Sequence, residues 1–177
     1  ETVRSRRAED ERAASIVGAK TVHFDFPDCI YRRGADGEPL YPLDVFAEPL
    51  PAEADLPAQM TATLLSRLAS DDVLVCPLTI GGHVDHVIVR KAVEGLGRPL
   101  QYYADVPYVL DHPSALETFT GRMQAKRQKV SSAGLVAWVD GISAYASQIP
   151  MLFESLEQMR ESMDVYGGAE VRLWRFV

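Results

Sequence analysis

The chain has 177 residues, 47% of them hydrophobic and 24% charged, which is the composition of an ordinary globular protein. Its net charge of −7 argues against a nucleic-acid partner or an anionic membrane surface, because phosphate groups would repel it. No apolar run approaches the ~18 residues of a membrane span, and the charged first residues show no secretory signal. The cysteines, Cys29 and Cys76, lie far apart without a CxxC motif, so we expect two reduced, buried thiols in a cytoplasmic protein.

Helical and strand-like patterns alternate along the first half of the chain. Residues 6–17 carry apolar side chains at helical spacing, and residues 20–26 alternate like a β-strand. Residues 29–57 contain five prolines and no periodicity, which predicts a long ordered loop. A helix at 58–69 and a buried strand at 72–76 follow.

The second half continues the alternation. The expected elements are strands at 98–103 and 169–176 and helices at 113–129, 135–148 and 151–163, the last two divided at Pro150. The basic residues Lys126, Arg127 and Lys129 are expected to form a solvated face. Such alternation predicts one α/β domain over residues 1–177 with a mostly parallel sheet. Because α/β folds usually open on a strand and this chain opens on a helix, we expect the founding strand to be missing.

The segment Pro77–Arg90, PLTIGGHVDHVIVR, joins the strand at 72–76 to an apolar pattern at helical spacing. Open α/β sheets bind ligands in loops of this kind. His83 and His86 are three residues apart, so both can face one cleft, and neutral imidazole is a common zinc ligand. Asp85 can accept a hydrogen bond from an imidazole and orient it. The pattern indicates a metal site with fewer than the about three ligands of catalytic zinc; alternatively, the histidines only cap the helix and bridge neighbouring loops.

Six stretches together resemble the LmbE-like (PIG-L) family of metal-dependent N-deacetylases. They are RRAED at 6–10 with Gly18-Ala19, HFDFPD at 23–28, PLTIGGHVDH at 77–86, YADVPY at 103–108, AYASQ at 144–148 and AEVRLW at 169–174. They follow the family's order through nearly the whole chain, and the HVDH loop is the most specific of them. The resemblance implies a Rossmann-like three-layer α/β/α fold.

The resemblance also implies roles for individual residues. His86, the last residue of HVDH, would ligate Zn²⁺ or another divalent metal, which would activate a water for attack on an acetamide carbonyl. His83 would stabilise the tetrahedral intermediate or protonate the leaving amine, and Asp85 would orient His83. The substrate-binding residues that it implies are Arg6, Arg7, Asp28, Asp105 and Tyr108.

The family's first signature, a PHxDD-type or HPDDE-type loop that supplies one histidine, one aspartate and the general base, does not occur in this sequence. In the family it precedes the helix of residues 6–17, so we expect a truncated or processed chain. The predicted function is N-deacetylation of an N-acetylated amino sugar or small sugar conjugate. The alternative is a non-catalytic member of the same fold that binds a small molecule or a partner. A phosphoesterase would use a further Asp and His cluster in the second half, where the sequence has none. The sequence does not define the oligomeric state.

Overall fold

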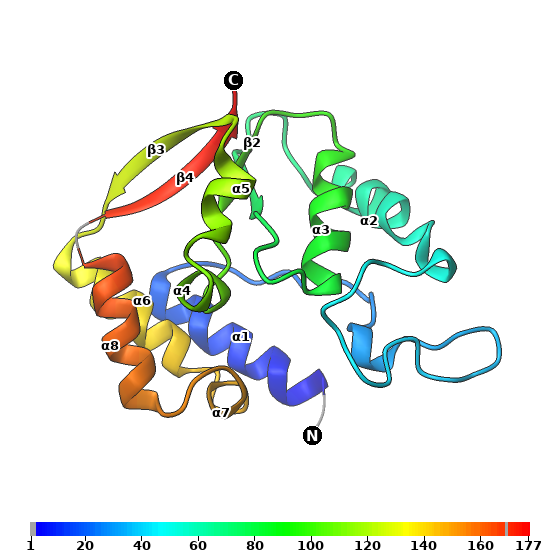
Figure 1. The fold of residues 1–177 in the computed structure, drawn as a ribbon, viewed down its shortest axis with the longest axis horizontal. Coiled ribbons are helices and arrows are strands. Elements are labelled where there is room, and N and C mark those ends of the chain that lie inside the picture. The colour runs from blue at the N-terminus through cyan, green and yellow to red at the C-terminus, as the bar shows by residue number, and fades with distance from the viewer. Residues whose placement is uncertain (1–2, 169) are drawn as a thin grey trace. The chain divides into compact units, whose positions relative to one another are not determined.

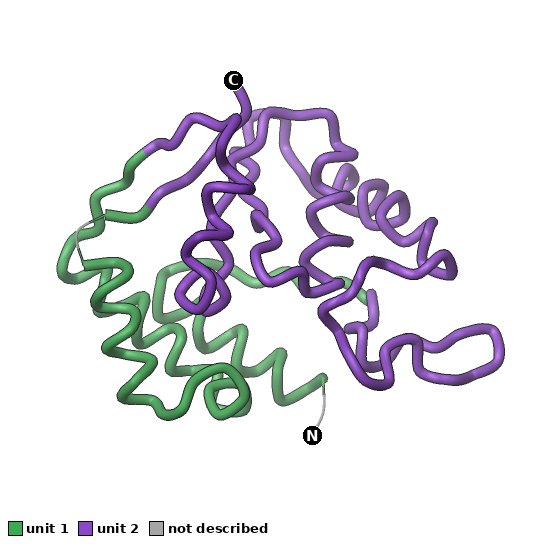
Figure 2. The backbone as a smooth tube through the Cα atoms, in the orientation of Figure 1, with its two compact units in different colours: residues 1–25, 127–171 green, residues 26–126, 172–177 purple. Residues whose placement is uncertain are grey.

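The computed structural model describes residues 3–168 and 170–177 (Figure 1). By its internal contacts the chain divides into two compact units, drawn in different colours in Figure 2. The first unit comprises residues 1–25 and 127–171, and the second comprises residues 26–126 and 172–177. That both units belong to one domain stays a prediction.

The second unit contains the strand–loop–helix segment that the sequence predicted. Its regular elements are η1 (Cys29–Tyr31), η2 (Pro51–Glu53), α2 (Leu56–Leu65), β1 (Leu74–Pro77), α3 (Val84–Glu94), β2 (Leu100–Tyr103), α4 (Tyr108–Asp111) and α5 (Ala115–Thr120). Strands β1 and β2 pair in parallel, from Leu74 opposite Leu100 to Pro77 opposite Tyr103. Helix α3 packs against α2 and β1. The parallel register brings the exits of both strands to the same edge of the sheet.

The sheet is mixed rather than mostly parallel. It has four strands in the order β1-β2-β4-β3, where β3 is Met123–Lys129 and β4 is Glu170–Phe176. Strand β4 runs antiparallel to β2, with Trp174 opposite Tyr102. The predicted α/β class is confirmed, because helices accompany this four-stranded sheet in a fold that matches a solved structure. The predicted closing strand is also confirmed, except for Ala169, which lies outside the described residues.

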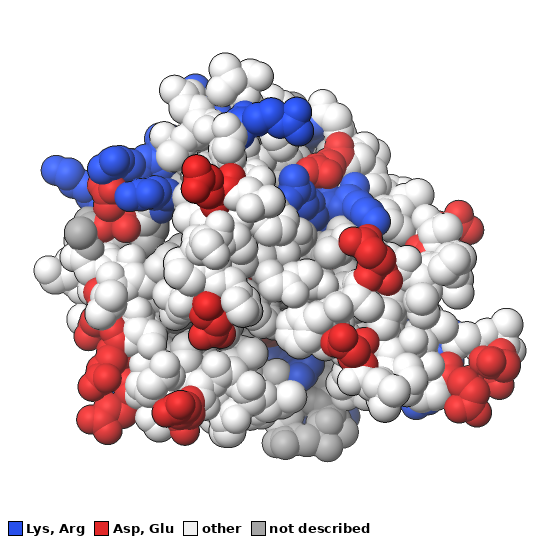
Figure 3. Space-filling view, viewed as in Figure 1, with Lys and Arg blue, Asp and Glu red and all other residues white. Residues whose placement is uncertain are grey.

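The helix predicted over 113–129 is wrong in its second half. Helix α5 ends at Thr120, and β3 begins at Met123. Strand β3 is mostly exposed and its partner β4 lies far along the chain, so neither burial nor a local pattern marks it in the sequence. Figure 3 shows Lys and Arg side chains gathered over β3, which agrees with the solvated basic face expected there.

The regular elements described in the first unit are helices and the ends of β3 and β4. Its helices are α1 (Val3–Val17), α6 (Ser132–Ser143), α7 (Ile149–Leu152) and α8 (Leu156–Gly167). Helix α1 packs on α6, and α8 packs on α6 and α7. The buried Glu9 of α1 accepts hydrogen bonds from the backbone N–H of Ser147 (2.9 Å) and from its hydroxyl (2.7 Å). Pro150 lies in the first turn of α7, a position that tolerates proline, and does not itself divide the helices.

The strand predicted at 20–26 is not formed, and these residues have no regular secondary structure. Its alternating sequence has no strand beside it among the described residues, and a strand requires a partner for its backbone groups. Val22 is 63% exposed, and His23 Nε2 lies 3.1 Å from Asp10 Oδ2 of α1. The segment therefore has strand-like composition without the pairing that makes a strand.

Two expectations from composition concern the thiols and the membrane. Both cysteines are free and buried, as the sequence predicted. Among the residues that the structure describes, no helix combines the length and apolar character needed to cross a membrane. The cytoplasmic location stays a prediction.

Candidate functional site

The loop after β1 is shaped by three residues with left-handed backbone angles. Thr79, Gly81 and Gly82 have φ values of 68°, 89° and 73°, and the Gly82 N–H donates to the Thr79 carbonyl at 3.0 Å. A Cβ on Gly81 would lie 2.7 Å from Cγ of Tyr108, so only glycine lets that ring pack on the loop backbone. The loop thus brings the start of α3 next to the segment that follows β2.

His83 is the N-cap of α3. Its Nδ1 accepts a hydrogen bond from the backbone N–H of Asp85 at 3.2 Å. Because a backbone N–H can only donate, the neutral ring carries its proton on Nε2. Burial, and then the charge of neighbouring His86, lowers the pKa of His83 below its ordinary value. His83 therefore presents a neutral Nε2–H donor.

His86 is held from behind by a buried carboxylate. Its Nδ1 lies 2.7 Å from Oδ1 of Asp105, whose side chain is only 1% exposed. The other oxygen, Oδ2, accepts the Ile80 N–H at 3.0 Å. A carboxylate only accepts, so Nδ1 of His86 donates, and in the neutral ring Nε2 keeps a free lone pair. This carboxylate–histidine arrangement is typical of imidazoles that bind a metal, and the His86 side chain is 34% exposed.

The expected role of Asp85, orienting His83, stays a prediction. The backbone N–H of Asp85 donates to the His83 ring. The carboxylate instead accepts the Cys29 N–H through Oδ2 (2.9 Å) and pairs with the Arg32 guanidinium through Oδ1. Arg32 also pairs with buried Glu53. The Asp85 side chain therefore ties α3 to the long loop of residues 29–57.

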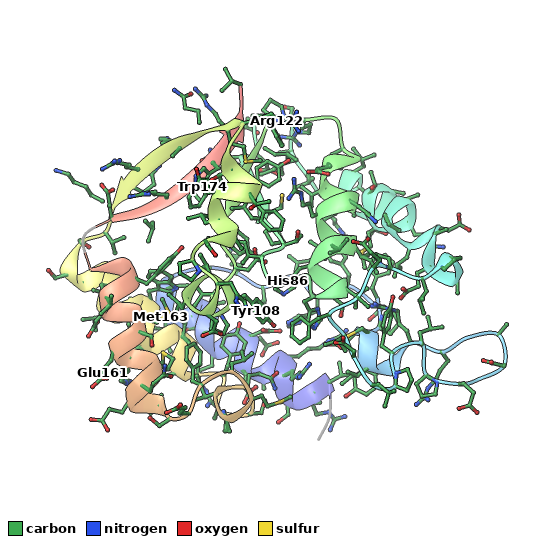
Figure 4. The ribbon with its side chains drawn as sticks, viewed as in Figure 1. His86, Tyr108, Arg122, Glu161, Met163 and Trp174 are labelled. Atoms are coloured by element: carbon green, nitrogen blue, oxygen red, sulfur yellow. The ribbon has the colours of Figure 1, made fainter. Side chains whose placement is uncertain are left out.

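Four aromatic rings lie in contact around the start of α3, and one of them, Phe46, was not expected from the sequence. Ring centroids are 5.7 Å apart for Phe46 and His83, 5.1 Å for His83 and His86, 6.0 Å for His86 and Tyr108, and 5.6 Å for Tyr108 and Phe46. Figure 4 labels His86 and Tyr108, which lie near one another in the second unit. Phe46 comes from a proline-rich loop without periodicity, so no local pattern marks it.

A second group of possible ligands lies beside His86. One ligand atom each from Cys29, His83 and Asp85 lies within 4.8 Å of the others. Burial, and then the charges of Asp85 and Asp28, raises the pKa of the Cys29 thiol to about 12, which disfavours the thiolate that a metal needs. Nδ1 of His83 is already occupied by a backbone N–H. His86, with its free Nε2, fits a metal better than this group does.

The residues predicted to bind substrate fall into both units. In the second unit, Tyr108 lies against His86, and Asp105 lies behind it. Asp28 caps η1 and accepts the Ile30 N–H at 3.2 Å, next to Cys29.

Arg6 and Arg7 belong to the first unit. Arg6 Nη2 donates to Gln148 Oε1 at 2.6 Å, and Arg7 Nη2 pairs with Asp25 Oδ1 at 3.1 Å. Their role in substrate binding stays a prediction.

The fold is that of a class of solved deacetylases. The chain matches the zinc-inhibited form of teicoplanin deacetylase Orf2 with a TM-score of 0.78 and 23% identity, over 97% of this chain and 73% of that one. It matches a deacetylase–bog complex from the teicoplanin biosynthesis pathway with a TM-score of 0.76 and 24% identity, over 97% and 72%. It matches the A40926 pseudoaglycone deacetylase Dbv21 with a TM-score of 0.64 and 23% identity, over 97% and 69%. At these identities the likeness establishes the fold alone.

One curated relative shares a short stretch of sequence. The 2'-N-acetylparomamine deacetylase of Streptomyces fradiae is 46% identical over 46 residues, which cover 24% of this chain and 16% of that enzyme. The match therefore spans about a sixth of the relative's length. No protein-family model matches the chain. Together these comparisons support the LmbE-like deacetylase fold that the sequence motifs predicted.

Proposed function

We propose that the protein is a metal-dependent N-deacetylase, an amide hydrolase acting on an N-acetylated amino sugar or small sugar conjugate. The observation that carries the proposal is the hydrogen bond between His86 Nδ1 and the buried Asp105, which leaves His86 Nε2 available to a metal. The fold shared with three deacetylases supports it, as does the short match to a deacetylase of an N-acetylated substrate.

The residues present fit a divalent metal through His86. A carboxylate behind the imidazole fixes its tautomer and raises its basicity, which favours binding of Zn²⁺ or a similar ion. When bound, such an ion supplies Lewis-acid polarisation of a carbonyl and lowers the pKa of a water toward ~7. Asp105 acts here by positioning His86, since its side chain is buried and both its oxygens accept hydrogen bonds.

His83 supplies the hydrogen-bond donor and the proton that amide hydrolysis needs. Its Nε2–H can donate to the oxygen on which negative charge develops, and such a donor contributes most where water is excluded. The same proton can pass to the departing amine, which cannot leave as an anion. The backbone N–H of Asp85 holds the ring in the required tautomer. Asp28, Tyr108, Arg6 and Arg7 are proposed to contact the substrate.

The second candidate is the alternative expected from the sequence. It is a non-catalytic protein of the same fold, which binds an amino sugar or a partner without hydrolysing it.

The two candidates are separated by measuring metal content and acetate release on the natural protein with a panel of N-acetyl amino sugars. We expect acetate release that a chelator abolishes and zinc restores. His86→Ala should lose metal and activity together, whereas His112→Ala, which removes an exposed histidine of the same unit, should keep both. Binding of the sugars without acetate release would favour the non-catalytic protein, and full activity of His86→Ala would exclude the proposed site.

A further inference from the structure

The four rings at the start of α3 form a closed cycle of contacts, in the order Phe46, His83, His86, Tyr108 and back to Phe46. Centroid separations around the cycle run from 5.1 to 6.0 Å. None of the four rings is buried, and Phe46 is 49% exposed. The two histidines are therefore adjacent on one side, and Phe46 and Tyr108, here called the aromatic wall, are adjacent on the other.

The aromatic wall is held in place by the backbone. The Val84 N–H of α3 donates to the Val45 carbonyl at 2.9 Å, and the Phe46 N–H donates to Asp44 Oδ1 at 2.8 Å. The Tyr108 ring lies against Gly81. Exposing the apolar surface of an aromatic ring to water is unfavourable. A ring that the backbone nevertheless holds exposed beside His83 and His86 is placed to contact a ligand.

We propose that Phe46 selects the acyl group of the substrate. This inference rests on the proposed deacetylase function, in which the amide carbonyl meets His86 and His83. The carbon attached to that carbonyl then faces the aromatic wall, whose two rings are in direct contact with the histidine rings. An acetyl methyl gains apolar contact there, whereas a longer acyl chain runs into the Phe46 ring. Phe46 is thus a specificity-determining residue that favours acetyl over longer acyl groups.

The test compares kcat/KM for N-acetyl, N-propionyl and N-butyryl derivatives of one amino sugar. Each added methylene should lower kcat/KM of the unaltered protein by about 10-fold or more, the usual range for one methylene in an apolar site. In Phe46→Ala the preference for acetyl should fall at least about tenfold. Tyr31→Ala removes another exposed aromatic ring of the same loop, 43% exposed, and should leave the preference unchanged.

A binding measurement separates failure of this inference from failure of the proposed function. Acetamide, titrated into the protein, should shift the ring proton resonances of Phe46 and Tyr108 more than butyramide does. Shifts of these ring resonances without hydrolysis of any sugar derivative would support contact between the acyl group and the rings and would overturn the proposed deacetylase function. Hydrolysis with the same acyl preference in the unaltered protein and Phe46→Ala would overturn the role of Phe46 alone. Absence of both hydrolysis and ring shifts would overturn both.

Discussion

Replacing Arg32, in the long loop of residues 29–57, with methionine should destabilise the protein. The Arg32 side chain is 6% exposed and pairs with Glu53, 3% exposed, and with Asp85, 24% exposed. Tyr41 donates its hydroxyl hydrogen to Glu53, and the Arg32 guanidinium lies 5.6 Å from the Tyr41 ring centroid. Methionine keeps much of the side-chain volume but leaves two carboxylates without their cation.

The size of the effect follows from burial. Removing one partner of a buried ion pair costs about 3–5 kcal/mol, because the remaining charge stays desolvated. Glu53 is almost fully buried, whereas solvent reaches Asp85 in part, so we expect the lower end, about 3 kcal/mol. For a chain of this length that loss lowers the melting temperature by roughly 6–12 °C.

Urea denaturation gives the free energy of unfolding for this comparison. Arg33→Met is the matched control, since Arg33 is the exposed neighbour in sequence and its loss should change stability by less than about 0.5 kcal/mol. The double variant Arg32→Met with Glu53→Gln should recover part of the loss, because a neutral amide needs no counter-charge. An Arg32→Met loss below about 1 kcal/mol, or no larger than that of Arg33→Met, would refute the reasoning.

Three further predictions concern the site. Asp105→Asn should weaken metal binding about 10–100-fold, since an amide group cannot accept hydrogen bonds from both His86 and the Ile80 N–H. The control Asp111→Asn, at an exposed position, should leave metal binding unchanged. Competition with a chelator measures the affinity of both variants. His83→Ala should lower kcat about 10²–10⁴-fold with metal content unchanged, whereas His86→Ala should lose the metal; equal metal loss in both would contradict the assigned roles. Gly81→Ala should cost at least about 1–2 kcal/mol in thermal unfolding, since its φ of 89° and the ring covering it exclude a Cβ.

The site could be predicted from sequence where its parts are close along the chain. His83, Asp85 and His86 lie on one turn of α3, so spacing alone placed them together. The bond between His86 and Asp105 joins residues 19 positions apart and depends on the parallel register of β1 and β2. That register brings the loops after both strands to one edge, which local patterns do not reveal.

The sequence predictions that failed share a physical cause: contacts with residues far along the chain decide the structure and the role of these segments. Residues 20–26 have the alternation of a strand but no neighbouring strand among the described residues. Strand β3 has a neighbour, β4, but no alternation of buried and exposed side chains. Phe46 and Arg32 lie in a loop without periodicity, and only the folded contacts give them a role. Burial of a charge or placement of a ring cannot be inferred from such a segment.

The two histidines of HVDH share a helix end but differ in what each Nδ1 contacts. Nδ1 of His83 meets a backbone N–H, which can only donate, so the ring proton lies on Nε2. Nδ1 of His86 meets a carboxylate, which can only accept, so in the neutral ring the proton lies on Nδ1 and Nε2 keeps its lone pair. One ring can therefore give a hydrogen bond to a developing negative charge, and the other can bind a cation. If the Nδ1 contacts were exchanged, we would expect the proposed roles to be exchanged as well, so the proposal of one proton donor and one metal ligand rests on the tautomers and not on the histidine spacing.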